Sequence, residues 1–210
     1  MRWRHCGRCA VFEAALNGYL TSLSLILAIG PQNAFVLRQG IRAEHVLAVV
    51  AVCALSDAVL ISGGVAGFGA VSAAVPWLGV AMRWFGVAFL LVFGALRFRA
   101  ALRGGEALQP VAGEVVPLGR VVATCLVLTW ANPHVYLDTM VLLGSISTGY
   151  PQHALAFGAA AVAGSFSFFA VLGYGARLLA PVFASPRAWV VLEVVVGLTM
   201  WGIAATLALG

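Results

Sequence analysis

Lysine is absent from this 210-residue chain, and charged residues of every kind are scarce. Only 9% of the residues are charged, whereas soluble domains carry roughly 25%. This scarcity excludes a water-soluble domain of ordinary composition. The net charge of +5 comes entirely from arginines that lie mostly between apolar runs. We therefore interpret the positive charge as a signal of membrane topology, and we expect no nucleic-acid partner.

Cysteine is also sparse, with four residues in the chain. Cys53 and Cys125 lie inside apolar runs, where a small packing role is usual. Cys6 and Cys9 form a lone CxxC pair with no second pair of ligands. The sequence therefore predicts no metal site and no cofactor.

Long apolar runs are what the chain does contain. Hydrophobic residues make up 62% of it and the mean hydropathy is +1.02, which is typical of an all-α polytopic membrane protein. Because one span needs about 20 residues, this length accommodates about six transmembrane helices. The predicted spans are Tyr19–Gln39, His45–Phe68, Trp77–Phe98, Val121–Leu143, His153–Leu179 and Trp189–Leu209.

The domain organisation follows from these runs. We expect residues 1–18 to form a tail and residues 19–210 to form a single transmembrane transporter domain. Its halves, about 19–98 and 121–209, are joined by the polar segment 99–120.

The two halves resemble a degenerate repeat. An offset of about 102 residues places Pro133 on Pro31, and one of about 108 places His153 on His45. Because each half would contain three spans, an odd number, the second half must enter the membrane from the opposite side. The prediction is a pair of inverted three-helix repeats, as in many secondary transporters.

The arginines also predict an orientation. They follow the first, third and fifth runs, so the positive-inside rule places those loops in the cytoplasm and both termini outside. Arg2, Arg4 and Arg8 oppose this orientation. One resolution is that the first residues are not part of the mature fold.

Two proline breaks lie near the middle of apolar runs, at Gly30-Pro31 and at Asn132-Pro133. In lipid, a broken backbone is tolerated only where it packs in protein or lines a wet cavity. A matched pair of breaks in the two halves of a chain indicates a transport site.

Acidic residues are the strongest candidates for chemistry at that site. Asp57 and Asp138 lie deep in predicted spans, where a carboxylate costs roughly 2.5 to 3.5 kcal/mol and usually marks a substrate or proton path. A purely structural role, with Asp57 tied to a hydroxyl such as that of Ser56, is the alternative. For Glu193 we favour a structural role beside Arg187 and the lipid head groups.

Amides and aromatic rings surround the breaks. The amides of Asn33 and Asn132 can bind a ligand, and Gln32 extends this patch together with His134. The alternative is that these groups only satisfy the broken backbone. Trp130 and Tyr136 can hold a guanidinium or ammonium by cation-π contact, although packing or interfacial anchoring is an equal alternative.

Three motifs resemble a known family. The run from Ala28 to Gly40 (AIGPQNAFVLRQG), the triplet Leu55-Ser56-Asp57 and the run from Thr129 to Thr139 (TWANPHVYLDT) are similar to those of the LysE-type lysine/arginine exporters of bacteria. The resemblance extends from about Tyr19 to the C-terminus. It implies export of L-arginine, L-lysine or both across the cytoplasmic (inner) membrane by a multi-pass protein. It also implies that the polar family positions correspond to Asn33, Asp57, Asn132, Pro133 and Asp138.

The mechanism we expect is proton-coupled antiport by alternating access. Expelling one positive charge against an inside-negative potential costs about 2.3 kcal/mol per 100 mV, and one entering proton cancels that charge movement. Asp57 and Asp138 are the candidates to exchange a proton for the substrate. A homo-oligomer is compatible with the sequence.

Other functions remain as alternatives. Exporters of neutral amino acids share this architecture, so the fold alone does not fix the substrate. A channel would conduct passively, without saturable export. An intramembrane aspartyl protease is disfavoured, because neither aspartate follows the glycine of a Gly-x-Gly-Asp motif.

Overall fold

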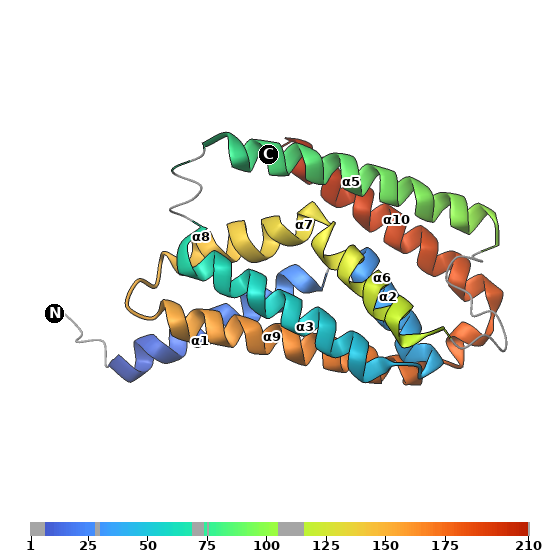
Figure 1. Ribbon diagram of the computed structural model, residues 1–210, viewed down its shortest axis with the longest axis horizontal. Helices are drawn as coiled ribbons and strands as arrows, with labels where there is room; N and C mark the ends of the chain where they lie inside the picture. The colour runs from blue at the N-terminus through green and yellow to red at the C-terminus, as the bar shows by residue number, and fades with distance from the viewer. Residues whose placement is uncertain (1–6, 28–29, 69–73, 75, 105–115, 210) are drawn as a thin grey trace.

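The computed structural model describes residues 7–27, 30–68, 74, 76–104 and 116–209. Within these ranges the protein is entirely helical, and no residue lies in a strand (Figure 1). The helices in chain order are α1 (Gly7–Ile26), α2 (Pro31–Arg42), α3 (Val46–Gly63), η1 (Gly64–Phe68), α5 (Pro76–Leu102), α6 (Leu118–Trp130), α7 (Pro133–Tyr136), η2 (Leu137–Leu142), α8 (Leu143–Ser147), α9 (Ala154–Gly175), η3 (Ala176–Leu179), η4 (Val182–Ala184) and α10 (Pro186–Leu209).

Within the described ranges, five helices are long and apolar enough to cross a membrane. The qualifying segments are Cys9–Ile26, Val46–Gly67, Arg83–Leu102, Ala154–Leu179 and Pro186–Thr206. The predicted span Val121–Leu143 does not appear as one helix. Here α6, with 13 residues, ends at Trp130, and the chain continues after a break into α7, η2 and α8. The chain is therefore a helical protein with several membrane-crossing segments.

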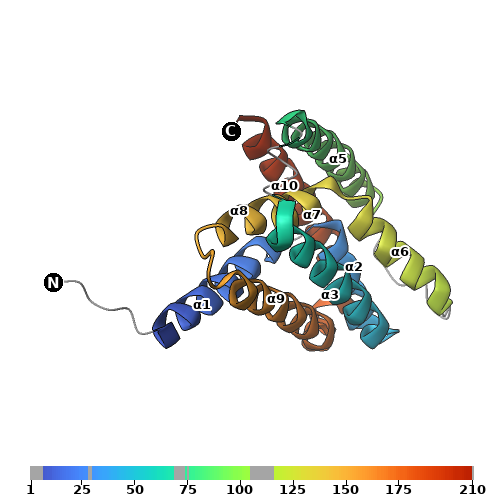
Figure 2. The same cartoon turned by 60° about the vertical axis from the view of Figure 1, so that its left-hand side comes forward.

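The helices run along the long axis of the molecule in three groups (Figures 1 and 2). On one side α5 packs along α10, and on the opposite side α1 packs along α9. Between these pairs lie α2, α3 and the broken segment α6–α8. Both breaks therefore lie inside the bundle, where protein surrounds them.

The first helix begins earlier than expected. We predicted a tail over residues 1–18, but α1 begins at Gly7, and residues 1–6 lie outside the described part of the chain. Ala14 is fully buried in a cluster with Phe157 and Ala161 of α9. A Cβ at Gly18 would collide with the carbonyl of Phe157. Residues 7–18 therefore belong to the packed bundle, because small residues let α1 approach α9 closely.

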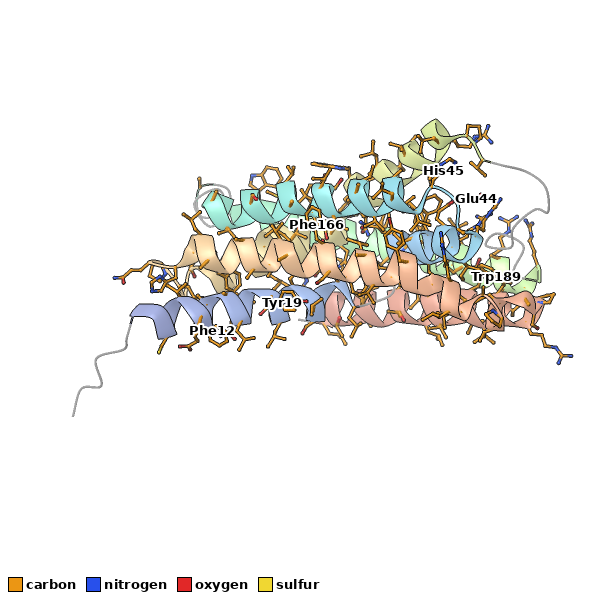
Figure 3. All side chains as sticks on the ribbon, turned by 90° about the horizontal axis from the view of Figure 1, so that it is seen from below. Phe12, Tyr19, Glu44, His45, Phe166 and Trp189 are labelled. Atoms are coloured by element: carbon orange, nitrogen blue, oxygen red, sulfur yellow. The ribbon has the colours of Figure 1, made fainter. Side chains whose placement is uncertain are left out.

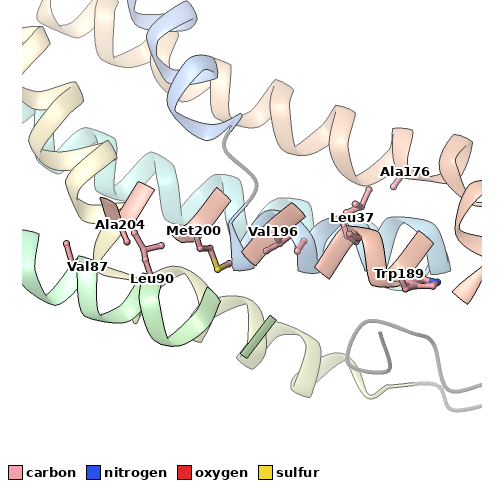
Figure 4. Packing of buried hydrophobic residues seen from close by; sticks show 10 residues of the cluster. Leu37, Val87, Leu90, Ala176, Trp189, Val196, Met200 and Ala204 are labelled. Atoms are coloured by element: carbon pink, nitrogen blue, oxygen red, sulfur yellow. The ribbon is translucent and has the colours of Figure 1, made fainter. Parts of the chain in front are cut away.

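A hydrophobic core joins α5 and α10 to α2 (Figure 4). Leu90 of α5 packs with Val196 and Met200 of α10, each at most 1% exposed. Leu37 brings α2 against the same cluster. This contact fixes the second half of the first broken helix against the α5–α10 pair.

Candidate functional site

The first break lies between α1 and α2. Gly30 has an extended backbone (φ −94°, ψ −174°) and precedes α2, which begins at Pro31. Proline suits this first helical position because its fixed φ is helical and it has no N–H to satisfy. Gly30 is the N-cap residue of α2 and has no side chain with which to cap it. The Asn33 amide donates to the carbonyl of Ile26 across the break, at 2.7 Å. The N-cap residue of the first break therefore does not satisfy the first-turn N–H groups of α2.

The second break lies between α6 and α7 and is satisfied differently. Asn132 is the N-cap residue, and its side-chain oxygen accepts from the N–H of His134 at 3.1 Å. Pro133 again occupies the first helical position. The chain then forms the π-helical turn η2, which carries Asp138. Such turns occur frequently at functional sites.

A small cavity joins the two breaks. Its volume is about 60 Å³, enough for a few water molecules, and well below the roughly 300 Å³ of an ordinary ligand pocket. Apolar side chains from α1, α5, α9 and α10 form part of its wall. The polar or break-forming residues on it are Gly30, Pro31, Gln32, Asn33, Asp57, Asn132, His134, Asp138 and Thr139.

Asp57 of α3 is the most deeply placed acid on this cavity. It is 3% exposed, and it accepts a hydrogen bond from the Ser165 hydroxyl of α9 at 2.8 Å. Ser56 does not serve Asp57, because its hydroxyl accepts instead from the Trp130 indole at 3.1 Å. Within the described residues, no arginine forms an ion pair with Asp57. Its carboxylate is therefore held by one neutral donor and faces the cavity.

Asp138 of η2 lines the same cavity and has a different partner. Its Oδ2 lies 3.2 Å from Nε2 of His134, one helical turn earlier. Both side chains are slightly exposed, at 16% and 17%. The other ring nitrogen of His134 has no hydrogen-bond partner among the described residues. The two breaks and α3 thus bring both predicted acids to one space.

Gln32 contributes a weakly engaged donor at the first break, since among the described residues its amide approaches only the thiol of Cys53, a weak acceptor. The residue is 7% exposed and lines the cavity, and its Nε2 has no hydrogen-bond partner in the described part of the chain. Buried polar groups without a partner are rare in proteins. The Gln32 amide is therefore available to a ligand or water in the cavity.

Trp130 and Tyr136 lie beside the second break but do not line the cavity. Their rings meet edge to face with centroids 6.4 Å apart, and the Tyr136 hydroxyl donates to the carbonyl of Trp130 at 2.9 Å. In this arrangement the two residues brace the break. Of the predicted substrate-binding side chains, these two are the ones that the structure places outside the cavity.

Glu193 has a different partner from the one expected. We predicted a structural role near Arg187 and the lipid head groups, but Glu193 is fully buried. Its Oε2 lies 3.3 Å from the Arg97 guanidinium, which joins α10 to α5. A buried carboxylate is tolerated when an opposite charge accompanies it. The structural role stands, with Arg97 as the partner.

Ser165 is the site residue that the sequence reasoning missed. A serine in an apolar helix gives no signal by itself. The offset of 108 residues that aligns His153 with His45 does, however, place Ser165 on Asp57. The two residues that meet across the bundle are separated by this same offset.

Comparison with known proteins identifies the family. The chain matches the family described as LysE type translocator over residues 23–210. It is 47% identical over 182 residues to "Putative amino-acid transporter Rv0488" of Mycobacterium tuberculosis, covering 87% of this chain and 90% of that protein.

Two further relatives carry a more specific name. The chain is 42% identical over 199 residues to the arginine exporter protein ArgO of Pectobacterium carotovorum, covering 94% of this chain and 98% of that protein. It is 41% identical over 197 residues to ArgO of Salmonella paratyphi A, covering 91% and 92%. No solved structure matches this chain.

These matches decide between a transporter and an enzyme. LysE type translocators and ArgO exporters are transporters, so the aspartyl protease alternative is rejected. The multi-pass helical fold agrees with that class. The family match covers most of the chain, and the predicted resemblance is confirmed: this protein belongs to the LysE type translocator family.

Proposed function

We propose that this protein exports basic amino acids, L-arginine, L-lysine or both, across the cytoplasmic (inner) membrane. The observation that carries the proposal is one cavity between two helix breaks, lined by two carboxylates that no arginine neutralises among the described residues. Relatives named arginine exporters support the choice of substrate.

The substrate's charges suggest how it binds. Asp57 and Asp138 hold the side-chain cation, since both carboxylates line the cavity. Gln32 and Asn33 line the cavity at the N-terminus of α2 and hold the α-carboxylate there, where the helix dipole favours an anion.

The second break completes the binding site. Asn132 shapes its edge, while cation-π contact with Trp130 or Tyr136 requires the site to open beyond the state seen here. The small volume of the cavity fits an occluded state that must widen to admit an amino acid.

We propose six membrane crossings arranged as inverted three-helix repeats. The sixth crossing is the broken segment α6–α8. Such a repeat makes α1 equivalent to α6, α3 equivalent to α9 and α5 equivalent to α10. The packing of α1 with α9 then corresponds to the packing of α6 with α3, and the α5–α10 pair corresponds to itself. Both pairs of contacts are present, and the proline breaks of α2 and α7 correspond as well. In this proposal the packed residues form a single transporter domain, with the two halves joined by the segment 99–120.

Transport is by alternating access, with a proton entering as the substrate leaves. Export of a cation against the membrane potential costs about 2.3 kcal/mol per 100 mV, so an opposing proton removes that cost. Asp57 is paired with Ser165, and Asp138 is paired with His134. Neither partner carries a permanent positive charge, so either carboxylate can hold a proton when the substrate is absent. Rocking of the two halves about the breaks would then expose the site to each side in turn.

Efflux from reconstituted vesicles tests this proposal. Proteoliposomes are loaded with labelled arginine, lysine or leucine, and efflux is followed with and without a proton gradient that is acidic outside. We expect rapid, saturable efflux of arginine or lysine that the gradient accelerates, and slow efflux of leucine. Equal efflux of leucine would favour the neutral amino-acid alternative. An efflux rate that is the same with and without the gradient would exclude proton coupling.

A further inference from the structure

A second, larger cavity lies at one end of the bundle. We call it the arginine vestibule. Its volume is about 390 Å³, within the range of amino-acid-sized ligand sites. Its walls come from α2, α5 and α6, and Pro31 lines both this cavity and the central one. The vestibule therefore reaches Pro31 of the first break, which separates it from the central cavity.

The lining of the vestibule carries positive charge. Arg38, Arg97 and Arg120 line it, and no carboxylate does so among its described residues. It lies toward the end of the molecule that holds Glu44, His45 and Trp189, where nitrogen-bearing side chains gather (Figure 3). A cation by itself is repelled from such a space, whereas an anionic group is attracted.

Two buried polar atoms in the vestibule walls lack partners. The Nε of Arg97 and the Oε1 of Gln39 have no hydrogen-bond partner among the described residues. Gln39 is 3% exposed. A carboxylate can accept from the first atom and an ammonium can donate to the second, and these are the two charged groups of an α-amino acid.

Arg97 is held in place by Glu193. The NH1 group lies 3.3 Å from the buried carboxylate of Glu193. This carboxylate binds the guanidinium at NH1, and the Nε atom has no hydrogen-bond partner among the described residues. A planar guanidinium fixed in this way is oriented before a ligand arrives. Glu193 is in this respect a positioning residue for the vestibule.

We propose that the arginine vestibule is an entry site that binds the α-carboxylate of the transported amino acid. This inference rests on the proposed function, since the ligand is the exported substrate. It adds a first selection for the carboxylate at the vestibule, before the central site binds both the carboxylate and the side-chain cation. Amines that carry the same cation without a carboxylate are rejected at the vestibule.

Agmatine, which is arginine without its carboxylate, tests the proposal. Binding to the purified protein is measured as the ligand-dependent rise in Tm, and efflux of labelled arginine and agmatine is measured in proteoliposomes. For the wild type we expect arginine to bind at least about tenfold more tightly than agmatine, because one charge-assisted contact is lost. We expect the efflux rates to differ in the same direction.

Three variants locate the effect. Arg120→Gln removes an exposed charge of the vestibule, and the double variant Arg97→Gln, Glu193→Gln removes both members of the buried pair, so that no lone charge remains. Arg99→Gln, an exposed residue of α5 that does not line the vestibule, is the matched control. We expect the preference for arginine over agmatine to fall several-fold in the first two variants and to persist in the control.

The outcomes separate this inference from the proposed function. Equal binding of arginine and agmatine to the wild type, or a preference that survives in both vestibule variants, overturns the vestibule proposal even if arginine is exported. A Tm that responds through Arg120 to phosphatidylglycerol but not to amino acids also overturns it, in favour of a lipid phosphate. If arginine is not exported, the proposed function fails. The rise in Tm with arginine and with leucine then still tests whether the vestibule binds a carboxylate.

Discussion

The two helix breaks look alike in sequence but are satisfied in opposite ways. At the second break, the side chain of Asn132 caps α7 by accepting from the N–H of His134. At the first break, Gly30 has no side chain to cap α2, and the Gln32 Nε2 has no hydrogen-bond partner among the described residues. The first break therefore presents the Gln32 amide to the cavity, whereas at the second break Asn132 satisfies a backbone donor and η2 presents the Asp138 carboxylate.

This difference gives the cavity a polarity. An amino acid with a cationic side chain has an anionic end and a cationic end, and the two breaks present the complement of each. Asp57, between them on α3, adds to the acidic side. Two breaks of the same kind would not orient such a substrate.

The largest effect is expected from removing the acid of the second break. Asp138→Asn keeps the side-chain shape but removes a charge that lines the cavity and that we propose binds the substrate cation. We expect kcat/KM for arginine efflux to fall at least about tenfold, since a hydrogen bond to a charged group is worth about 1.5 to 3 kcal/mol. Glu13→Gln, an exposed acid of α1, is the matched control and should transport normally. Unchanged efflux in Asp138→Asn would show that the Asp138 carboxylate does not bind the substrate cation.

A smaller effect is expected from removing a donor of the first break. Gln32→Ala should raise KM for arginine several-fold, because a typical hydrogen bond contributes about 0.5 to 1.5 kcal/mol. The unfolding midpoint should change little, because the Gln32 Nε2 has no partner in the described protein. Gln152→Ala, on the surface, is the control. A large loss of stability with no change in KM would assign Gln32 a structural role.

The smallest effects are expected from exchanging the caps. Gly30→Asn fits, because the backbone there is extended and a Cβ would meet no atom within 4 Å. A cap on α2 should add a few tenths of a kcal/mol of stability, and it should raise KM about twofold to fivefold by competing with the substrate carboxylate. Asn132→Ala should cost about 1 kcal/mol of stability. Thermal unfolding and efflux kinetics distinguish the two, and a lower KM in Gly30→Asn would contradict the assigned polarity.

The sequence was enough to predict the two breaks and both acids of the cavity. Proline in an apolar run and a carboxylate at membrane depth are each costly, so each stands out without a structure. The first and fourth spans were predicted as apolar runs that each contain a proline break, and the helices are interrupted at both places. Residues that are energetically costly inside a membrane thus indicate where a site lies.

Partners across the bundle were not predictable in the same way. Glu193 pairs with Arg97, 96 positions away, rather than with nearby Arg187. Ser165 reaches Asp57 from another helix. The roles of Trp130 and Tyr136 depend on which way each ring turns from the break, and apolar helices lack the periodicity that would fix those directions. Helix packing determines these contacts, and local composition does not predict how the helices pack.

The most direct test of the account compares arginine with citrulline, its uncharged isostere. Efflux of each labelled compound is measured from proteoliposomes that contain the wild type or Asp57→Asn. The account predicts that the wild type exports arginine at least about tenfold faster than citrulline, and that Asp57→Asn removes most of this preference. Equal export of the two compounds by the wild type, or a full preference for arginine in Asp57→Asn, would contradict a cation site at the centre of the bundle.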